Sequence, residues 1–316
     1  MSTKVKLSND KLNLKGKTAV ISGGTQGIGK AVAIRFAQLG ISQVYLIGRN
    51  SKLGESVCDQ VKQIGENQNS LKSDCLFIQA DLSTVETIKE TVKKIENETK
   101  VDGIDYLVMS QGGPPNGLYE ETKDGFDKSF AVQVLSRFGL QNGLIEKNLL
   151  RSDSTIVSIL SPGSTYSNLD LNDLSLKKVY QSGVWRASFL IQQGKRDSMV
   201  TDALTLYFNR QNPSMRFYHL FPGYVETSAA SNRNLPFPIP QLGNLFGPIL
   251  ARTIGNTPQS YSDIPIYFAA NPEVKEKFQN QVCFNEKLVP IESSDWSKDH
   301  SNQESIYQKL SSFFSS

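Results

Sequence analysis

Short apolar runs recur along the chain at regular intervals and predict buried strands. The runs do not alternate cleanly with polar residues, which is typical of strands buried on both faces of a parallel sheet. The predicted strands are Thr18–Ser22, Val44–Gly48, Cys75–Ala80, Tyr106–Ser110, Thr155–Leu160 and Arg216–Phe221. Between them, apolar residues recur every three or four positions, as over residues 28–39 and 85–95, and predict amphipathic helices. This alternation predicts an α/β fold with a doubly wound parallel sheet.

No internal repeat or linker interrupts the alternation, so we expect a single domain over residues 1–316, with its core at about 16–285. Residues 231–260 are rich in Pro, Gly and Asn with large apolar residues between them. Long loops of this kind are commonly functional, so we expect an apolar substrate lid there, and a loop that packs on its own sheet is the alternative. In the tail, 286–316, a short helix around Glu304–Phe314 is expected to dock Leu310, Phe313 and Phe314.

The charge balance and the termini narrow the function classes. The chain has 34 basic and 31 acidic residues, a net charge of +3, which argues against nucleic acid as a partner. The first 17 residues carry charge throughout and predict no secretory signal. The longest uncharged stretch, Asn234–Leu250, is slightly short for a bilayer and holds four prolines. We therefore expect a cytoplasmic protein, and peripheral membrane contact through this stretch stays open.

The cysteines give no sign of a metal centre. Cys58, Cys75 and Cys283 are scattered without a CxxC motif, and the chain has only two histidines. This usage argues against a zinc site and against a disulfide framework, and it favours a reducing compartment. We expect no metal.

A glycine-rich turn follows the first predicted strand and leads directly into a helix. Glycines allow a tight turn and close approach of a ligand to the backbone, and the free N–H groups of a helix start attract phosphate. The strand, turn and helix together predict a dinucleotide phosphate site. The residues expected to bind the cofactor here are Ser22, Gly23, Thr25, Gln26, Gly27, Ile28 and Gly29.

The second predicted strand is followed by Arg49, 20 residues past Gly29. A dinucleotide-binding fold reads the adenosine ribose at this distance, and an acidic residue would select NAD. The guanidinium of Arg49 suits a 2′-phosphate instead, so the sequence favours NADP(H) over NAD(H) as cofactor. A solvated arginine at a strand end is the alternative.

These residues resemble the short-chain dehydrogenase/reductase family, whose glycine motif is T-G-x-x-x-G-I-G, with Ser22 here in place of Thr. The Asp81-Leu82 pair resembles the family's contact to the adenine ring. Ser110 and Gly112 fall in a segment where the family has N-A-G, so that only the glycine matches.

Pro222, Gly223, Val225 and Thr227 are similar to the family's P-G-x-V-x-T segment, which lies against the nicotinamide. The resemblance covers about residues 16–285 and implies a Rossmann-type fold. Residues 124–136 and 169–174 look most like the retinol-dehydrogenase-like and atypical fungal or protist members, which often act on lipophilic aldehydes, ketones and alcohols.

The resemblance also implies catalytic positions. The family holds the substrate oxygen with a Ser, donates a proton from a Tyr, binds the nicotinamide ribose with a Lys four residues later, and completes a water relay with an Asn. Alignment places Ser161 at the serine, Lys195 at the lysine, which also binds cofactor, and Gln133 at the asparagine. The tyrosine position is Ile191, which has no proton to give.

Three tyrosines are alternative proton donors: Tyr180, Tyr166 and Tyr224. Tyr180 is preferred because it lies in the insert 174–186 that departs from the family pattern, and water ordered by Lys195 and Gln133 is a further source. Two functions follow. The first is an NADP(H)-dependent oxidoreductase that interconverts a lipophilic aldehyde or ketone and an alcohol, with this small molecule as its partner. The second is a catalytically impaired homologue that binds NADP(H) as a sensor or partner-binding module. A homo-oligomer is compatible with either.

Overall fold

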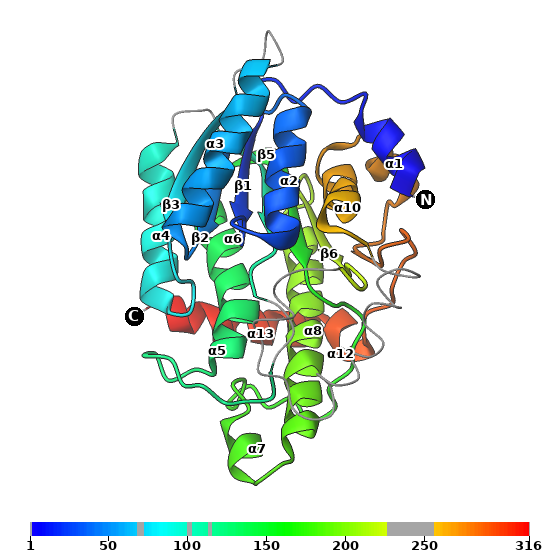
Figure 1. The fold of residues 1–316 in the computed structure, drawn as a ribbon. Helices are drawn as coiled ribbons and strands as arrows, with labels where there is room; N and C mark the ends of the chain where they lie inside the picture. The colour runs from blue at the N-terminus through cyan, green and yellow to red at the C-terminus, as the bar shows by residue number, and fades with distance from the viewer. Residues whose placement is uncertain (1, 68–72, 100–102, 113–115, 226–255, 316) are drawn as a thin grey trace, which may run out of the picture.

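A parallel sheet forms the centre of the computed structural model, which describes residues 2–67, 73–99, 103–112, 116–225 and 256–315 (Figure 1). Within these residues the sheet has seven strands in the order β3-β2-β1-β4-β5-β6-β7, and every neighbouring pair is parallel. The strands are β1 (Thr18–Ser22), β2 (Gln43–Gly48), β3 (Asp74–Gln79), β4 (Ile104–Met109), β5 (Leu150–Ile159), β6 (Arg216–Leu220) and β7 (Cys283–Phe284). The six predicted strands are confirmed, with ends shifted by a few residues, and the two-residue β7 is additional.

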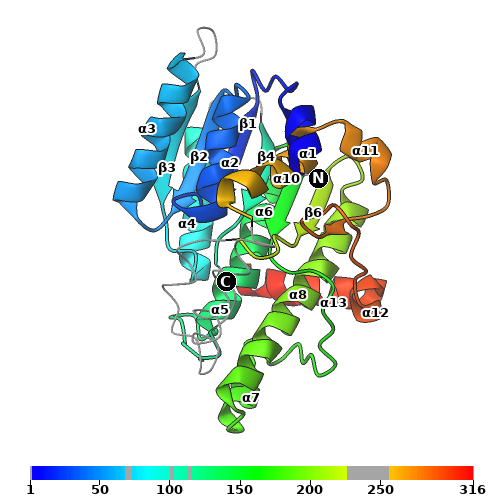
Figure 2. The same cartoon turned by 45° about the vertical axis from the view of Figure 1, so that its right-hand side comes forward.

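Helices cover both faces of the sheet (Figures 1 and 2). One layer holds α1 (Ser2–Asn9), α2 (Gly27–Gln38), α3 (Ser51–Asn67) and α10 (Pro258–Ala270). The other holds α4 (Val85–Glu98), α6 (Ser136–Glu146), α8 (Arg186–Gln211) and α13 (His300–Phe314). Shorter helices are α5 (Lys128–Phe130), the π-helical turn η1 (Ala131–Leu135), α7 (Lys177–Gln181), α11 (Glu273–Lys277) and α12 (Asp295–Lys298). The chain therefore has the expected Rossmann-type, doubly wound architecture in one domain.

Burial on both faces explains why the strand sequences do not alternate. Along β1, Ala19 and Ile21 pack into the apolar cluster under α2 and α3, whereas Val20 packs into the cluster under α4 and α6. Each side chain of the strand is withdrawn from water, so each position requires an apolar or small residue.

The tail packs back onto the domain as predicted. Leu310 of α13 is fully buried, the Phe313 ring lies 4.7 Å from that of Phe126, and the Phe314 ring lies 5.7 Å from that of Phe138. The helix begins at His300, four residues earlier than predicted, because Asp299 caps it by accepting a hydrogen bond from the Asn302 N–H.

The expectation that the cysteines form no disulfide is wrong. Cys58 of α3 and Cys75 of β3 are joined by a disulfide across a sequence separation of 17 residues. The two positions are distant in sequence, but α3 packs directly on the outer strand of the sheet, which brings the two buried sulfurs together. Cys283 is buried and not part of a disulfide.

Most of the expected lid lies outside the described residues, since 226–255 are not described. The described part begins at Asn256, and α10 follows with a capping box between Thr257 and Ser260. None of the helices among the described residues combines the length and the apolar character that a bilayer span requires.

Candidate active site

The chain reverses its direction of travel across the sheet between β1 and β4. After β1 it moves outward to β2 and β3, and then it returns to β4 on the other side of β1. The crevice outside the carboxyl ends of β1 and β4 is where open α/β sheets bind ligands. The glycine turn, the segment after β4 and the segment after β5 all begin at this edge.

The glycine turn is tied to the neighbouring strand ends by backbone contacts. The N–H groups of Gly23 and Gly24 donate to the carbonyl of Ile47 at 3.0 and 3.1 Å. Gly23 has a φ of +75°, and a Cβ there would lie 2.6 Å from the Gln111 nitrogen. A Cβ at Gly29 would lie 2.4 Å from the Gly23 oxygen. The turn therefore has space for backbone only, which is the cradle that a phosphate at a helix start requires.

The other predicted cofactor residues of the turn occupy distinct environments. The Ser22 side chain is fully buried, and its carbonyl accepts hydrogen bonds from both the Ser110 N–H at 2.9 Å and the Ser110 hydroxyl at 3.0 Å. Gln26 is exposed, Gly27 begins α2 with a φ of +57°, and Ile28 is half-buried. Ser22 and Ser110 thus hold the turn against the end of β4, Gln26 is the exposed residue of this stretch, and Ile28 packs against the core.

Arg49 follows directly after β2 and is exposed beside the turn. A Cβ at Gly48 would lie 2.3 Å from the Thr25 methyl group, so the turn packs against the residue that precedes Arg49. The main-chain oxygen of Arg49 accepts a 3.1 Å hydrogen bond from Gln79 at the end of β3. The two residues after Ala80 differ: Asp81 is exposed, whereas Leu82 is buried in the core and offers only its backbone to a ligand.

Gln133 lies against the segment that follows β4. A Cβ at Gly112, which has a φ of +92°, would lie 2.7 Å from Gln133 Oε1. Gln133 is buried within the π-helical turn η1, and such turns are frequent at functional sites. Gln133, expected at a catalytic position, and Gly112, expected to bind cofactor, therefore lie next to each other.

A buried arginine that the sequence analysis did not single out lies beneath this region. Arg137 donates from Nη2 to the Gln111 oxygen at 3.0 Å and from Nη1 to the Gln133 main-chain oxygen at 2.8 Å. Burial lowers the pKa of its guanidinium to about 10, and the nearby Asp197 opposes that effect. Its spacing of four residues from Gln133 is the signal in the sequence that could have pointed to it.

Ser161 follows the end of β5, as predicted, and the loop that it begins is held by α8. The Gly163 N–H donates to Asp202 Oδ2 at 2.9 Å, the Ser164 N–H donates to Ser198 Oγ at 3.1 Å, and the Tyr166 N–H lies 3.3 Å from the Met199 sulfur. Ser198 and Met199 precede Asp202 by four and three positions, so the three acceptors lie on one face of the helix.

Lys195 lies on the same stripe of α8. Ser198, Met199 and Asp202 are three, four and seven residues after Lys195, the spacings that share a helix face. Lys195 is exposed and precedes the part of the helix that holds the loop. The helix therefore presents Lys195 on the side of the loop that Ser161 begins.

The candidate proton donors have different surroundings. Tyr180, on α7, is 42% exposed, and its ring stacks on Tyr119 at 5.5 Å and contacts Phe189 at 5.2 Å. The buried Tyr166 donates from its hydroxyl to Gln192 Oε1 at 3.1 Å, and burial raises the pKa of the phenol. Tyr224 is exposed next to Gly223. Ile191, at the family's tyrosine position, is 54% exposed.

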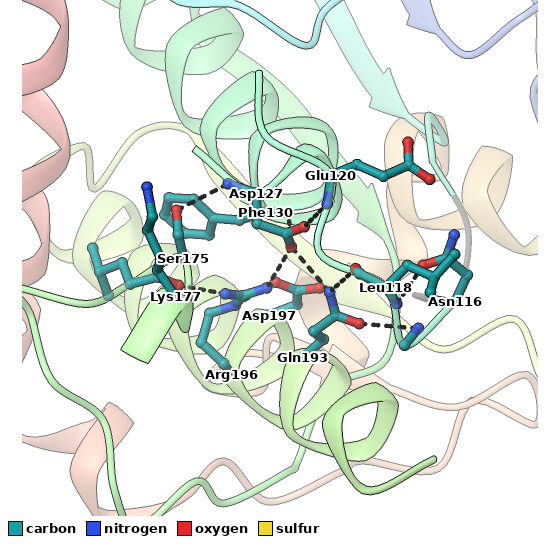
Figure 3. A network of polar contacts seen from close by, with 12 residues as sticks. Asn116, Leu118, Glu120, Asp127, Phe130, Ser175, Lys177, Gln193, Arg196 and Asp197 are labelled. Carbon is teal, nitrogen blue, oxygen red and sulfur yellow. Dashed lines mark hydrogen bonds and ion pairs between the residues drawn. The ribbon is translucent and has the colours of Figure 1, made fainter. Parts of the chain in front are cut away.

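A charged network anchors the first half of α8 to the segment between β4 and α5 (Figure 3). Gln193 donates to Asp127 Oδ2 and to the Leu118 oxygen, both at 3.0 Å. The fully buried Arg196 bonds Asp197 Oδ1 at 2.7 Å and lies 3.8 Å from Asp127 Oδ2. Burial raises the pKa of Asp127 and that of Asp197, the latter to about 6. The network ties the turn of α8 that includes Lys195 to the segment that precedes α5.

The segment after β6 is described only in part. Pro222 and Gly223 are half-buried, and Val225 forms a parallel bridge with Asn256. Thr227 lies outside the described residues. The described part leaves the sheet at the same carboxyl edge as the glycine turn.

Comparisons with known proteins agree with this architecture. A profile of the short chain dehydrogenase family matches residues 17–171. An oxidoreductase of Emericella nidulans is 28% identical over 223 residues, which cover 70% of this chain and 62% of that protein. Retinol dehydrogenase 14 of Mus musculus is 25% identical over 288 residues, which cover 88% of this chain and 81% of that protein. The chain thus spans less than two thirds of the length of the fungal relative.

Among solved structures, a 7α-hydroxysteroid dehydrogenase complexed with NADH and 7-oxo glycochenodeoxycholic acid has the same fold. It superposes with a TM-score of 0.62 at 20% identity, over 89% of this chain and 97% of that one. The family profile covers β1 to β5, the strands whose carboxyl ends carry the glycine turn and Ser161. By its sheet order, its glycine turn and its relatives, the chain belongs to the short-chain dehydrogenase/reductase family.

Proposed function

We propose that the protein is a nicotinamide-dinucleotide-dependent oxidoreductase that interconverts a carbonyl compound and its alcohol. The observation that carries the proposal is the shared face of α8, on which Lys195 precedes the three acceptors that hold the loop beginning at Ser161. The Ser161 hydroxyl would fix the substrate oxygen, and Lys195 would bind the cofactor ribose. A nicotinamide dinucleotide, when bound, supplies or accepts the hydride.

The residues of the crevice fit such a cofactor. Gly23 and Gly29 leave room for backbone only, and the start of α2 offers its N–H groups to the pyrophosphate. Arg49 is exposed beside the turn, where its guanidinium can form two hydrogen bonds with a 2′-phosphate. We therefore propose NADP(H) as the preferred cofactor.

The substrate proposed is lipophilic. Three of the large apolar side chains exposed in the described structure belong to segments at the carboxyl edge of the sheet: Ile191, Phe221 and Tyr224. Exposed apolar area gains free energy when a ligand covers it, at roughly 25 cal/mol per Å². These side chains would form the apolar wall of a substrate site that Ser161 lines with a polar group.

Because position 191 is an isoleucine, the proton is proposed to come from a tyrosine elsewhere in the chain. Tyr180 is the first candidate because it lies in the insert 174–186. Tyr166 is the second candidate because its hydroxyl contacts Gln192, which is one helical turn from Lys195. A donor must reach the developing alkoxide within hydrogen-bond distance. The variants Tyr180→Phe and Tyr166→Phe separate the two, since each removes one hydroxyl and keeps the ring.

The test is the oxidation of NADPH by the purified protein in the presence of lipophilic aldehydes and ketones. Wild type, Lys195→Ala and the two Phe variants are compared with NADPH and NADH. We expect substrate-dependent loss of reduced nicotinamide that prefers NADPH and falls at least about 100-fold in Lys195→Ala. Lys177→Ala is the matched control, because it removes an exposed lysine from the neighbouring α7.

The second candidate function, a cofactor-binding homologue without efficient chemistry, is favoured by the exposed Ile191 at the tyrosine position. It predicts NADPH binding, seen as quenching of tryptophan fluorescence, without turnover of any carbonyl in the panel. Turnover with a Lys195-dependent rate would exclude it, and the absence of both binding and turnover would exclude both functions.

A further inference from the structure

Three buried polar side chains meet below the start of the loop after β5. His219 of β6 and Asp202 of α8 are fully buried, and His219 Nδ1 lies 2.7 Å from Asp202 Oδ1. The thiol of Cys283, on β7, lies 3.4 Å from the same carboxylate oxygen. None of the three belongs to the predicted site residues.

The cluster binds the backbone of the loop at two points. The Ser161 N–H donates to His219 Nε2 at 3.2 Å, and the Gly163 N–H donates to Asp202 Oδ2 at 2.9 Å. Because Nε2 accepts a hydrogen bond, it carries no proton, and the ring proton must lie on Nδ1, from which it donates to Asp202. The hydrogen bonds thus select one tautomer of His219.

We propose that His219 and Asp202 are positioning residues that set the direction of the Ser161 hydroxyl through the main chain of Ser161 and Gly163. The inference rests on the role given to Ser161 under the proposed function. The direction of a side-chain hydroxyl follows the orientation of the backbone that carries it. The hydrogen bonds of the Ser161 N–H and the Gly163 N–H, on either side of Pro162, restrict that backbone. Small misplacements of a reacting group lower rates steeply, by about 100-fold for 1 Å.

The same contacts argue against a metal at this cluster. A neutral histidine that binds a metal through Nδ1 carries its proton on Nε2, where it would face the Ser161 N–H. Burial also raises the pKa of the Cys283 thiol, which favours a protonated sulfur as donor to Asp202. The cluster is therefore read as a hydrogen-bonded clamp.

Two substitutions of His219 separate its two contacts. His219→Gln places an amide oxygen near the position of Nε2 and can still accept from Ser161, whereas His219→Asn places an amide nitrogen near Nδ1 and keeps only the bond to Asp202. We expect kcat for carbonyl reduction to stay within about 3-fold of wild type in His219→Gln and to fall at least about 10-fold in His219→Asn, with the NADPH Kd unchanged in both. Cys283→Ser, which contacts Asp202 but not the loop, is the matched control.

A variant of Asp202 keeps the inference testable where His219→Asn does not fold. In the isosteric Asp202→Asn, the amide NH₂ must face either His219 Nδ1 or the Gly163 N–H. In the first orientation Nδ1 accepts, the ring proton moves to Nε2, and the bond from the Ser161 N–H is lost. In the second orientation the bond from the Gly163 N–H is lost. We expect its kcat to fall like that of His219→Asn. Equal losses in His219→Gln and His219→Asn that follow their thermal midpoints would overturn the inference in favour of a purely structural cluster.

Amide hydrogen exchange separates failure of this inference from failure of the proposed function. Exchange at Ser161 and Gly163 is measured on wild type and on the three variants, with or without turnover. Faster exchange at Ser161 in His219→Asn but not in His219→Gln supports the clamp even if the wild type reduces no carbonyl. Unchanged exchange in His219→Asn, or one equivalent of bound metal found by elemental analysis of the purified protein, would overturn it.

Discussion

Arg137 donates a 2.9 Å hydrogen bond from Nη2 to the main-chain oxygen of Ile159, the last residue of β5. The same nitrogen binds the Gln111 oxygen after β4. One buried cation therefore joins the segments at the ends of β4 and β5. Gly112 and Ser161 follow shortly after these ends. Each bond joins a charged donor to a main-chain carbonyl and is therefore stronger than a bond between neutral groups, so the two segments are held firmly against each other.

Arg137→Met should strongly destabilise the protein. It removes the guanidinium that donates to four main-chain oxygens and that lies beside the buried Asp197, and breaking such a buried arrangement costs about 3–5 kcal/mol. Chemical denaturation measures the change. Arg151→Met is the control, because Arg151 is one-third exposed and pairs with Asp105 at 3.4 Å, so that its loss should cost at most about 1 kcal/mol. Similar losses in both variants would contradict the role given to Arg137.

Gly23→Ala should abolish tight dinucleotide binding. Gly23 and Gly16 have nearly the same φ, +75° and +79°. An alanine Cβ at Gly23 would collide with the Gln111 backbone, whereas one at Gly16 would have no atom within 4 Å. Gly16→Ala therefore isolates the backbone strain, about 1–2 kcal/mol, and should leave binding unchanged. Gly23→Ala adds the collision and displaces the turn. Fluorescence titration with NADPH and thermal unfolding of both variants test this, and equal effects on binding would show that space at the turn is not the cause.

Arg49→Ala should weaken NADPH much more than NADH. Loss of a charge-assisted contact to the 2′-phosphate corresponds to about 2 kcal/mol, or roughly 30-fold in Kd. Lys62→Ala is the control for net charge, because Lys62 is a half-exposed residue of the same helix layer that pairs with Asp74 at 3.6 Å. An equal loss for NADPH and NADH in Arg49→Ala would indicate that Arg49 does not read the 2′-phosphate.

Asp197→Asn should change how stability depends on pH. Burial raises the pKa of Asp197 from 3.8 to about 6 in the folded protein, so the folded state holds a proton that the unfolded chain releases earlier. The stabilisation is present below pH 4 and is lost as pH rises through 6. Wild type should therefore lose up to about 3 kcal/mol relative to Asp197→Asn between pH 4 and 7.

Denaturation midpoints at intervals of one pH unit measure this difference. Asp170→Asn supplies the contrast, because the Asn172 N–H lowers the pKa of the exposed Asp170 carboxyl and its removal should act in the opposite direction. Parallel stability curves for wild type and Asp197→Asn would mean that Asp197 does not titrate in this range.

Loss of the disulfide should destabilise the protein. Closing the 17-residue separation between Cys58 and Cys75 restricts the unfolded chain and is worth about 3 kcal/mol. A Cys58→Ala/Cys75→Ala variant should show this loss, and dithiothreitol should lower the wild-type midpoint without affecting the variant. Alkylation of the unfolded, unreduced protein should label Cys283 alone. Labelling of all three cysteines would show that the bond does not form under those conditions.

The sequence alone determined the sheet, its strands and the cofactor turn, because these are local properties. A run such as Thr18–Ser22 is apolar at successive positions, and the glycines after it permit one kind of turn whatever lies nearby. The docked tail helix was predictable for the same reason, since Leu310, Phe313 and Phe314 lie on one face of it.

The tertiary structure decided which distant residues meet, and no local pattern encodes that. The disulfide requires α3 to lie on β3, and the clamp on Ser161 requires β6, β7 and α8 to converge below one loop. His219 and Asp202 stand in apolar surroundings in the sequence without a spacing that relates them. Only packing removes both from water, and a buried polar group must then find a partner, which here is the backbone that carries Ser161.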